Sequence, residues 1–220
     1  MKFCWILVSA CLLGCAQLVA QRTYRANSVL ADGAWYKIGV TAQGVYKIDL
    51  ALLNKLGINA SNIPSSAVRL YGNGGGMLPE NPREAVIDDI RENSLWAEDG
   101  GDGVLNGSDY LLFYSPGPHR WQSTPFRYLK NLYSDTAYYF IQIASAGKRI
   151  TTFTGSAPSA LTVTSYDYRY HYESDTFNFL SSGKQWFGEE FSTLPGRSLS
   201  RIFSVPMPGP GPHLLNVTTR

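Results

Sequence analysis

The chain has 220 residues, and its 19 lysines and arginines against 17 acids give a formal net charge of only +2. Without a basic stripe, this balance argues against nucleic acid and anionic membrane surfaces as partners. Aromatic residues make up 13% of the sequence, and glycine and proline are frequent at 21 and 12 residues. This composition predicts a mainly β fold with sandwich-like antiparallel sheets and one or two short helices.

The N-terminal segment has the composition of an export signal. Lys2 precedes a short apolar stretch over residues 5–13, about half the ~20 residues of a membrane-spanning helix. We therefore expect a signal peptide over residues 1–20, with cleavage after Ala20. Because residues 12–15 resemble a bacterial lipobox, acylation of Cys15 is the alternative. Neither route requires a transmembrane helix, and later apolar runs are too short to form one.

All three cysteines, Cys4, Cys11 and Cys15, lie within this export segment. From residue 16 to residue 220 there is no thiol that could act as a nucleophile, ligate zinc or form a disulfide. Once exported, the chain is therefore expected to perform no thiol chemistry. Its fold has to be stabilised by a hydrophobic core, which about 200 residues are long enough to provide.

The first β signals are two runs, residues 35–40 and 45–49, separated by residues 41–44. This spacing predicts a hairpin in which Tyr36, Ile38 and Val40 share one face.

The clearest helix signal follows directly. Asp49 can cap the first turn, Leu50, Leu53 and Leu56 recur at three-residue spacing, and Gly57 ends the pattern. These features predict a helix of two turns that packs as a lid on a sheet.

Further β segments are expected at seven places: residues 67–71, 109–114, 137–143, 148–153, 161–172, 186–188 and 201–205. In the longest of them, the alternating tyrosines at 166, 168, 170 and 172 predict one packed aromatic face. The proline-rich residues 206–212 predict a linker, and residues 213–219 a further strand. We therefore expect a β-rich domain over residues 21–195 and the start of a truncated second β unit over 196–220.

The acidic loop over residues 98–109 has the most informative spacing. Asp102, Asn106 and Asp109 fall where a dockerin-like calcium loop places its ligands, and Gly103 permits the sharp turn between them. However, Glu98 stands at the first ligand position and Gly100 replaces a side-chain ligand at the third. The prediction of calcium bound through Asp102, Asn106 and Asp109 therefore competes with a plain acidic turn that leads into the next strand.

Other motifs favour structural roles. The glycine run at residues 72–76 lacks the lysine and hydroxyl of a phosphate loop and predicts a tight turn between strands. His119, His171 and His213 are expected to be structural or surface histidines, because no serine stands in a nucleophile elbow. The adjacent pairs Asp88–Asp89 and Glu189–Glu190 are expected to be surface acids. We predict no catalytic residue.

Six stretches of the chain, taken together, carry a family resemblance. They are WYKIGVTAQGVYKID (35–49), RLYGNGGGMLPE (69–80), DGGDGVLNGSDYLLFYSPGPHRW (99–121), YSDTAYYFI (133–141), YDYRYHYESD (166–175) and SGKQWFGEEFS (182–192). This combination is similar to the N-terminal region of the type IX secretion sortases, the PorU family of gingipain-like cysteine peptidases. The resemblance extends over nearly all of the chain that follows the export segment.

The resemblance implies a cell-surface protein of a Gram-negative bacterium, exported to the outer membrane. Members of this family are much longer and carry a caspase-like domain with a Cys–His dyad downstream of the β-rich region. They remove C-terminal sorting domains from cargo proteins, so the implied partners are cargo and other secretion components. None of the dyad can be carried over to this chain, which is expected to be the non-catalytic portion and inactive alone.

A second function class remains open. A free-standing secreted module could bind glycan or a surface protein through exposed aromatics around Trp121 and Trp186. An independent hydrolase has the least support, because no nucleophile or carboxylate constellation stands out in the sequence.

Overall fold

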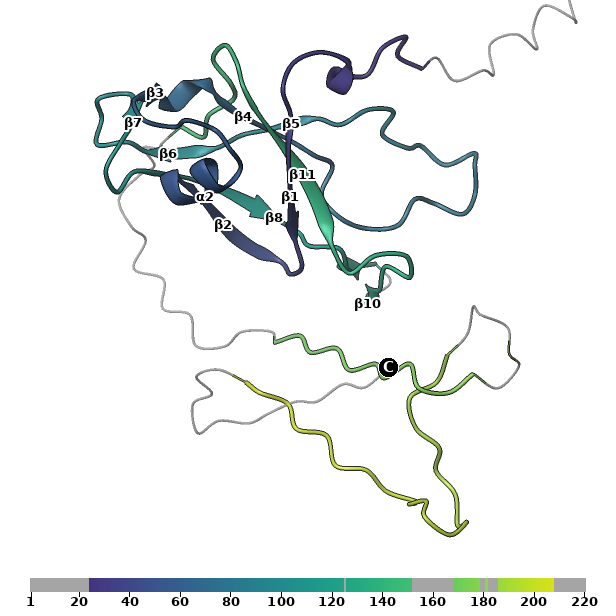
Figure 1. Ribbon diagram of the computed structural model, residues 1–220. Helices are drawn as coiled ribbons and strands as arrows, with labels where there is room; N and C mark the ends of the chain where they lie inside the picture. The colour runs from purple at the N-terminus through teal and green to yellow at the C-terminus, as the bar shows by residue number, and fades with distance from the viewer. Residues whose placement is uncertain (1–23, 125, 152–167, 179–180, 182–185, 208–220) are drawn as a thin grey trace, which may run out of the picture. The chain divides into compact units, whose positions relative to one another are not determined.

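The computed structural model describes residues 24–124, 126–151, 168–178, 181 and 186–207 (Figure 1). The chain divides into two compact units, residues 1–154 and 155–220, which are treated separately below. The predicted signal peptide, the alternative lipidation site at Cys15 and the strand expected over residues 213–219 lie outside the described residues. Within the described ranges, no helix is long and apolar enough to cross a membrane.

Two antiparallel sheets form the body of the first unit. One has four strands in the order β1 (Tyr36–Val40), β11 (Ala137–Ile143), β4 (Val68–Tyr71) and β5 (Glu92–Asn93). The other has three, in the order β2 (Gly44–Asp49), β8 (Tyr110–Ser115) and β6 (Trp96–Glu98) (Figure 1). Two-stranded pairings add β3 (Ile63–Pro64) with β7 (Val104–Leu105), and β9 (Arg120–Ser123) with β10 (Phe126–Leu129). The predicted mainly β, antiparallel fold is confirmed.

The hydrophobic core lies between these two sheets. Phe113 of β8 packs against Tyr139 of β11 with ring centroids 5.1 Å apart, and the Tyr139 hydroxyl donates to Ser115 Oγ at 3.0 Å. The fully buried aliphatic side chains come from both sheets, from the helix, from β7 and from the link between β5 and β6: Ile48, Leu53, Val68, Leu70, Leu95, Leu105, Leu111 and Ile141. Burial of this alternating set, at roughly 25 cal/mol per Å² of apolar surface, is the main force that holds the sheets together.

The predicted hairpin of residues 35–49 is wrong, although the predicted face is correct. β1 pairs with β11 and β2 pairs with β8, so the two runs belong to different sheets. The chain crosses between the sheets at residues 41–43, where the Tyr46 hydroxyl donates to Ala42 O at 2.7 Å and accepts from Ala42 N at 3.3 Å. Val40 is buried, and Tyr36 and Ile38 pack against the same core.

The predicted helix is confirmed as α2 (Leu50–Lys55). The Asp49 carboxylate accepts a hydrogen bond from the backbone N–H of Leu52 at 2.9 Å, which satisfies one free donor of the first turn. At the other end Gly57 has φ +82°, and the N–H of Ile58 donates to Leu53 O at 3.0 Å. Leu53 is fully buried, so the helix covers one edge of the core next to β2 (Figure 1).

The remaining predictions for the first unit vary in outcome. The strands expected at residues 67–71, 109–114 and 137–143 are present as β4, β8 and β11. The one expected at 148–153 is reduced, within its described part, to a single parallel bridge between Arg149 and Leu95. The glycine run makes no tight turn; it begins the connection of residues 72–91 that leads from β4 to β5.

In the second unit, the described residues form isolated bridges, Phe177 with Phe187 and Phe191 with Ser198. Residues 168–172 and 201–205, both expected to be strands, carry no strand pairing. Tyr168, Tyr170 and Tyr172 are 38–43% exposed, so the predicted packed aromatic face is absent from the described part of that segment. Alternation alone does not create a strand, because a strand needs a hydrogen-bonded neighbour. The predicted domain boundary near residue 195 stays a prediction.

Candidate functional site

The loop predicted to bind calcium is held by its own side chains. Asp102 accepts hydrogen bonds from Val104 N at 2.9 Å and from Asn106 Nδ2 at 3.3 Å. Asp109 accepts from Asn106 N at 2.9 Å. The structure therefore brings Asp102, Asn106 and Asp109 into one connected turn, and each carboxylate stabilises the loop backbone.

These contacts account for the loop without a cation. In the described part of the chain, no three histidine, cysteine, aspartate or glutamate side chains form a group that could hold a metal. A calcium ion would have to compete with the backbone donors for the carboxylate oxygens, since calcium requires six to eight oxygen ligands. Binding of calcium at Asp102, Asn106 and Asp109 stays a prediction.

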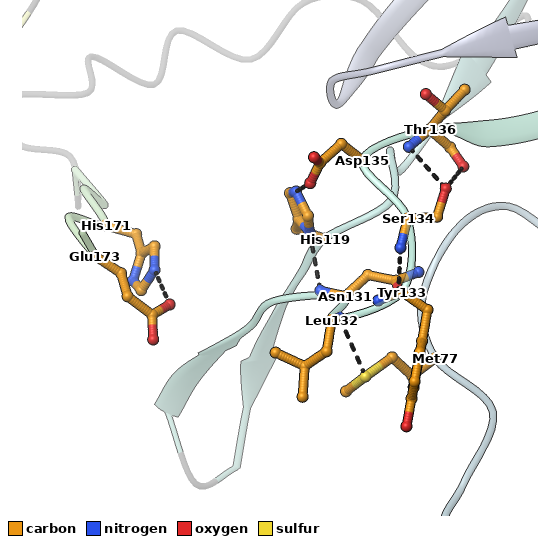
Figure 2. A network of polar contacts seen from close by, with 10 residues as sticks. All are labelled: Met77, His119, Asn131, Leu132, Tyr133, Ser134, Asp135, Thr136, His171 and Glu173. Carbon is orange, nitrogen blue, oxygen red and sulfur yellow. Dashed lines mark hydrogen bonds and ion pairs between the residues drawn. The ribbon is translucent and has the colours of Figure 1, made fainter. Parts of the chain in front are cut away.

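The two described histidines lie in local polar networks, one in each unit (Figure 2). His119 Nδ1 accepts a hydrogen bond from Asn131 N at 2.9 Å, and its Nε2 lies 3.6 Å from Asp135 Oδ1. Since Nδ1 is an acceptor, the ring proton is on Nε2. His171 Nε2 lies 3.1 Å from Glu173 Oε2. His119 contacts a backbone amide and a carboxylate, which is the arrangement of a structural histidine. His213 lies outside the described residues.

The network around His119 fixes a turn over residues 131–134. Asn131 Oδ1 accepts hydrogen bonds from Tyr133 N at 3.0 Å and Ser134 N at 3.2 Å. The N–H of Leu132 points at Met77 Sδ, 3.4 Å away (Figure 2). This turn leads into β11, so the network positions a core strand.

Both predicted pairs of surface acids make specific contacts. Asp89 accepts hydrogen bonds from Val29 N at 2.7 Å and Ser28 Oγ at 2.9 Å, and the Val29 bond is the main cause that lowers the Asp89 pKa. Asp88 accepts from Arg25 N at 2.6 Å. In the second unit, Glu189 accepts from Tyr172 Oη at 2.7 Å. The aspartates therefore fasten the N-terminal segment to the 72–91 connection, a role that sequence spacing did not indicate.

A half-buried arginine that the sequence did not single out organises one end of the sandwich. Arg149 Nη2 donates to Val68 O at 2.8 Å and to Ser65 O, and Nη1 donates to Lys148 O at 2.7 Å. Burial lowers the pKa of this guanidinium. Its Nε is buried and has no hydrogen-bond partner in the described structure. Arg149 therefore joins two loops to β4 through backbone carbonyls.

Two carboxylates belong to the same region. Glu92 binds Arg69 through two hydrogen bonds of 3.2 and 2.7 Å, and this pairing is the main cause that lowers the Glu92 pKa. Asp99 accepts from Ser65 Oγ, which lowers the Asp99 pKa. Both carboxylates therefore have hydrogen-bond partners within the chain, as expected for a structural network.

An open cavity of about 410 Å³ adjoins this network. Its walls are residues 96–101, which include Trp96, Glu98 and Asp99, together with Arg149, Ile150 and Thr151. Its lining combines one indole, that of Trp96, with three charged side chains, those of Glu98, Asp99 and Arg149. Sequence reasoning missed it because residues about 50 positions apart form it.

The aromatic residues of the alternative hypothesis are placed differently. Trp121 on β9 stacks on Phe126 of β10 with centroids 5.2 Å apart and lies 5.0 Å from Tyr128. Its ring is therefore occupied within the β9–β10 pair. Trp186, in the second unit, is 47% exposed.

Comparisons with known proteins give a partial likeness to a solved structure. No family model and no curated protein matches the chain. A crystal structure of dimeric latent PorU from Porphyromonas gingivalis is similar to it, with 29% sequence identity and a TM-score of 0.43. The match covers 67% of this chain and 13% of that chain, so this sequence spans a small part of the other protein's length. A likeness of this extent does not establish membership of the family.

Proposed function

We propose that the chain is the N-terminal, non-catalytic region of a type IX secretion sortase, a cell-surface cysteine endopeptidase and transpeptidase that removes C-terminal sorting domains from cargo. One observation carries the proposal: the resembling stretches 35–49, 69–80, 99–121 and 133–141 contain β1, β2 and β8 and most of β4 and β11, the principal strands of the sandwich. The resembling residues thus form much of the two sheets of the first unit. No cysteine follows Cys15, so the role is support or partner contact.

The proposed location and partners follow from this assignment. The protein would be exported and held at the outer membrane or cell surface of a Gram-negative bacterium. Its partners would be cargo proteins and the other outer-membrane components of the type IX system. The sequence pattern of residues 1–20, which predicts an export signal, supports that location.

Activity of the purified chain tests the proposal. Incubated with a cargo protein that carries its C-terminal sorting domain, the chain should neither cleave nor transfer it, because it has no thiol nucleophile after residue 15. A full-length sortase serves as the positive control. Cleavage that persists in the presence of a thiol-blocking reagent would contradict the proposal. The gene supplies a second test: a reading frame continuing past Arg220 should encode a cysteine and a histidine in a caspase-like domain.

A free-standing secreted β-sandwich that binds glycan or a surface protein is the second candidate. The exposed ring of Trp186 favours it, since an indole left half in water is a common contact for such ligands. A stop codon directly after Arg220, together with binding to cell-surface material that Trp186→Ala abolishes, would select this candidate over the first.

A further inference from the structure

The outer face of the β2–β8–β6 sheet carries an aromatic ring and a carboxylate side by side. On β6, Ala97 packs against the core, so its neighbours Trp96 and Glu98 point to the opposite face. Across the sheet, Trp96 is in register with Leu112 and Glu98 with Tyr110. Trp96 and Glu98 also line the 410 Å³ cavity, so both are open to a ligand.

Of the three charged residues that line this cavity, only Glu98 lacks a partner of its own. Asp99 accepts hydrogen bonds from Ser65 Oγ and from Gly101 N. Arg149 is held by backbone carbonyl groups. Among the described residues, Glu98 forms no ion pair and no cation lies over the Trp96 ring. The cavity therefore presents one uncompensated negative charge beside an indole.

On the same face of this sheet, and again on the four-stranded sheet, the chain fills the same arrangement with a cation of its own. Lys47 Nζ lies 5.8 Å from the Tyr110 ring centroid and 3.0 Å from Asp49 Oδ2. A second example has an arginine, with Arg69 5.1 Å from the Tyr71 centroid and its guanidinium 2.7 Å from Glu92.

In both examples, a positive group is close to the face of a ring and to a carboxylate, and both attract it. Trp96 and Glu98 supply the ring and the carboxylate without the cation.

We propose that the Trp96–Glu98 cavity binds the lysine or arginine side chain of a partner polypeptide. Tryptophan is the strongest ring for a cation, and the ammonium or guanidinium group would approach Glu98 with its alkyl stem against the indole. A volume of about 410 Å³ is sufficient for one long side chain. The proposal concerns binding alone and holds whether the chain supports a sortase or acts as a free-standing module.

The test uses the full chain and three capped amino acids, Nα-acetyl-lysinamide, Nα-acetyl-argininamide and the uncharged Nα-acetyl-norleucinamide. NMR follows the indole Nε1–H signal of Trp96, which is assigned by its loss in Trp96→Phe. We expect the two cationic probes to shift this signal saturably, with dissociation constants in the millimolar range, and norleucinamide to leave it in place. Glu98→Gln should weaken the lysinamide complex about threefold to fivefold, the effect of one exposed ion pair.

Two matched variants control for charge and for aromatic content. Asp32→Asn removes an exposed negative charge elsewhere, and Tyr133→Ala removes a ring that is 86% exposed. Both should bind lysinamide as the unmodified chain does. An unshifted Trp96 signal with both cationic probes, equal binding of norleucinamide, or an unchanged affinity in Glu98→Gln would each overturn the proposal. Neither peptidase activity nor secretion enters this assay, so its outcome is separate from that of the proposed function.

Discussion

At the scale of single residues, charged side chains in this protein mostly stabilise backbone. Arg149 binds three carbonyl groups, and Glu92 accepts both from Arg69 and from Lys148 N at 2.8 Å. Composition gives the number of charges, but it cannot tell a solvated acid from one whose oxygens are used in a network. Which kind an acid is depends on which loops meet in the fold. The stability contributed by an acid in such a network changes measurably with pH.

Glu92→Gln should lower the free energy of unfolding by about 2 kcal/mol near neutral pH, because it removes the charge from a part-buried bidentate pair. The Glu92 pKa is lowered in the folded state from the ordinary value of 4.5, first by Arg69. The ionised Glu92 carboxylate therefore contributes its full stabilisation above pH 4.5, the ordinary pKa. This stabilisation is lost as the pH falls through the lower pKa of the folded state. Urea unfolding of both proteins at a series of pH values measures this.

The two curves should converge at acid pH, where both proteins have an uncharged side chain at position 92. Asp32→Asn, which removes one exposed negative charge, is the charge-matched control for a change in net charge alone. A constant difference between Glu92→Gln and the unmodified chain from neutral to acid pH would show that the Glu92 charge is not the stabilising feature.

At the scale of elements, the conformation of a loop depends on its contacts with other loops. The glycine run is an example: a Cβ added at Gly75 would overlap the carbonyl oxygen of Gly117 and the Cα of Pro118. Glycine is needed there because two backbones approach closely, whereas the sequence suggested a tight turn. The helix α2 behaves differently, since its cap at Asp49 and its stop at Gly57 are local and were predicted.

Gly75→Ala should destabilise the fold by about 2 kcal/mol, the cost of forcing a methyl group into a closed contact. Gly44→Ala is the matched control, because a Cβ there has its nearest neighbour, in Tyr46, at 3.9 Å. Thermal melting of both variants should show a lower midpoint for Gly75→Ala alone. Equal midpoints would mean that the 72–76 and 117–118 backbones can separate without cost.

The acidic loop provides a second prediction at this scale. If Asp102, Asn106 and Asp109 bind calcium, millimolar calcium should raise the melting temperature, because an ion bound only to the folded form stabilises it. Asp102→Asn should remove that increase, and magnesium at the same concentration controls for ionic strength. An unchanged midpoint with calcium would leave the loop as an acidic turn closed by its own hydrogen bonds.

At the scale of the whole molecule, the first unit depends on the contact between its two sheets. Phe113 and Tyr139 meet across that contact, one from each sheet. Because Phe113 and Tyr139 belong to the hydrophobic core that both sheets share, loss of their contact should destabilise the whole first unit.

Phe113→Ala should cost about 3–5 kcal/mol of unfolding free energy, through lost burial and the cavity left behind. Tyr114→Ala, the neighbouring residue that is 56% exposed on the outer face, should have little effect. Urea denaturation followed by tryptophan fluorescence compares them. Similar losses for both variants would show that the outer face is as important to the fold as the space between the sheets.

The sequence by itself determined the features that depend only on residues close together along the chain. Alternation placed Tyr36, Ile38 and Val40 on the core side, and capping chemistry placed both ends of α2. The tertiary structure decided the partners. β1 joins β11 about 100 residues away, and Trp96 and Glu98 meet Arg149 at one cavity. The physical reason is that a side chain's direction follows from local backbone geometry, whereas the choice of neighbour depends on burial shared by distant segments.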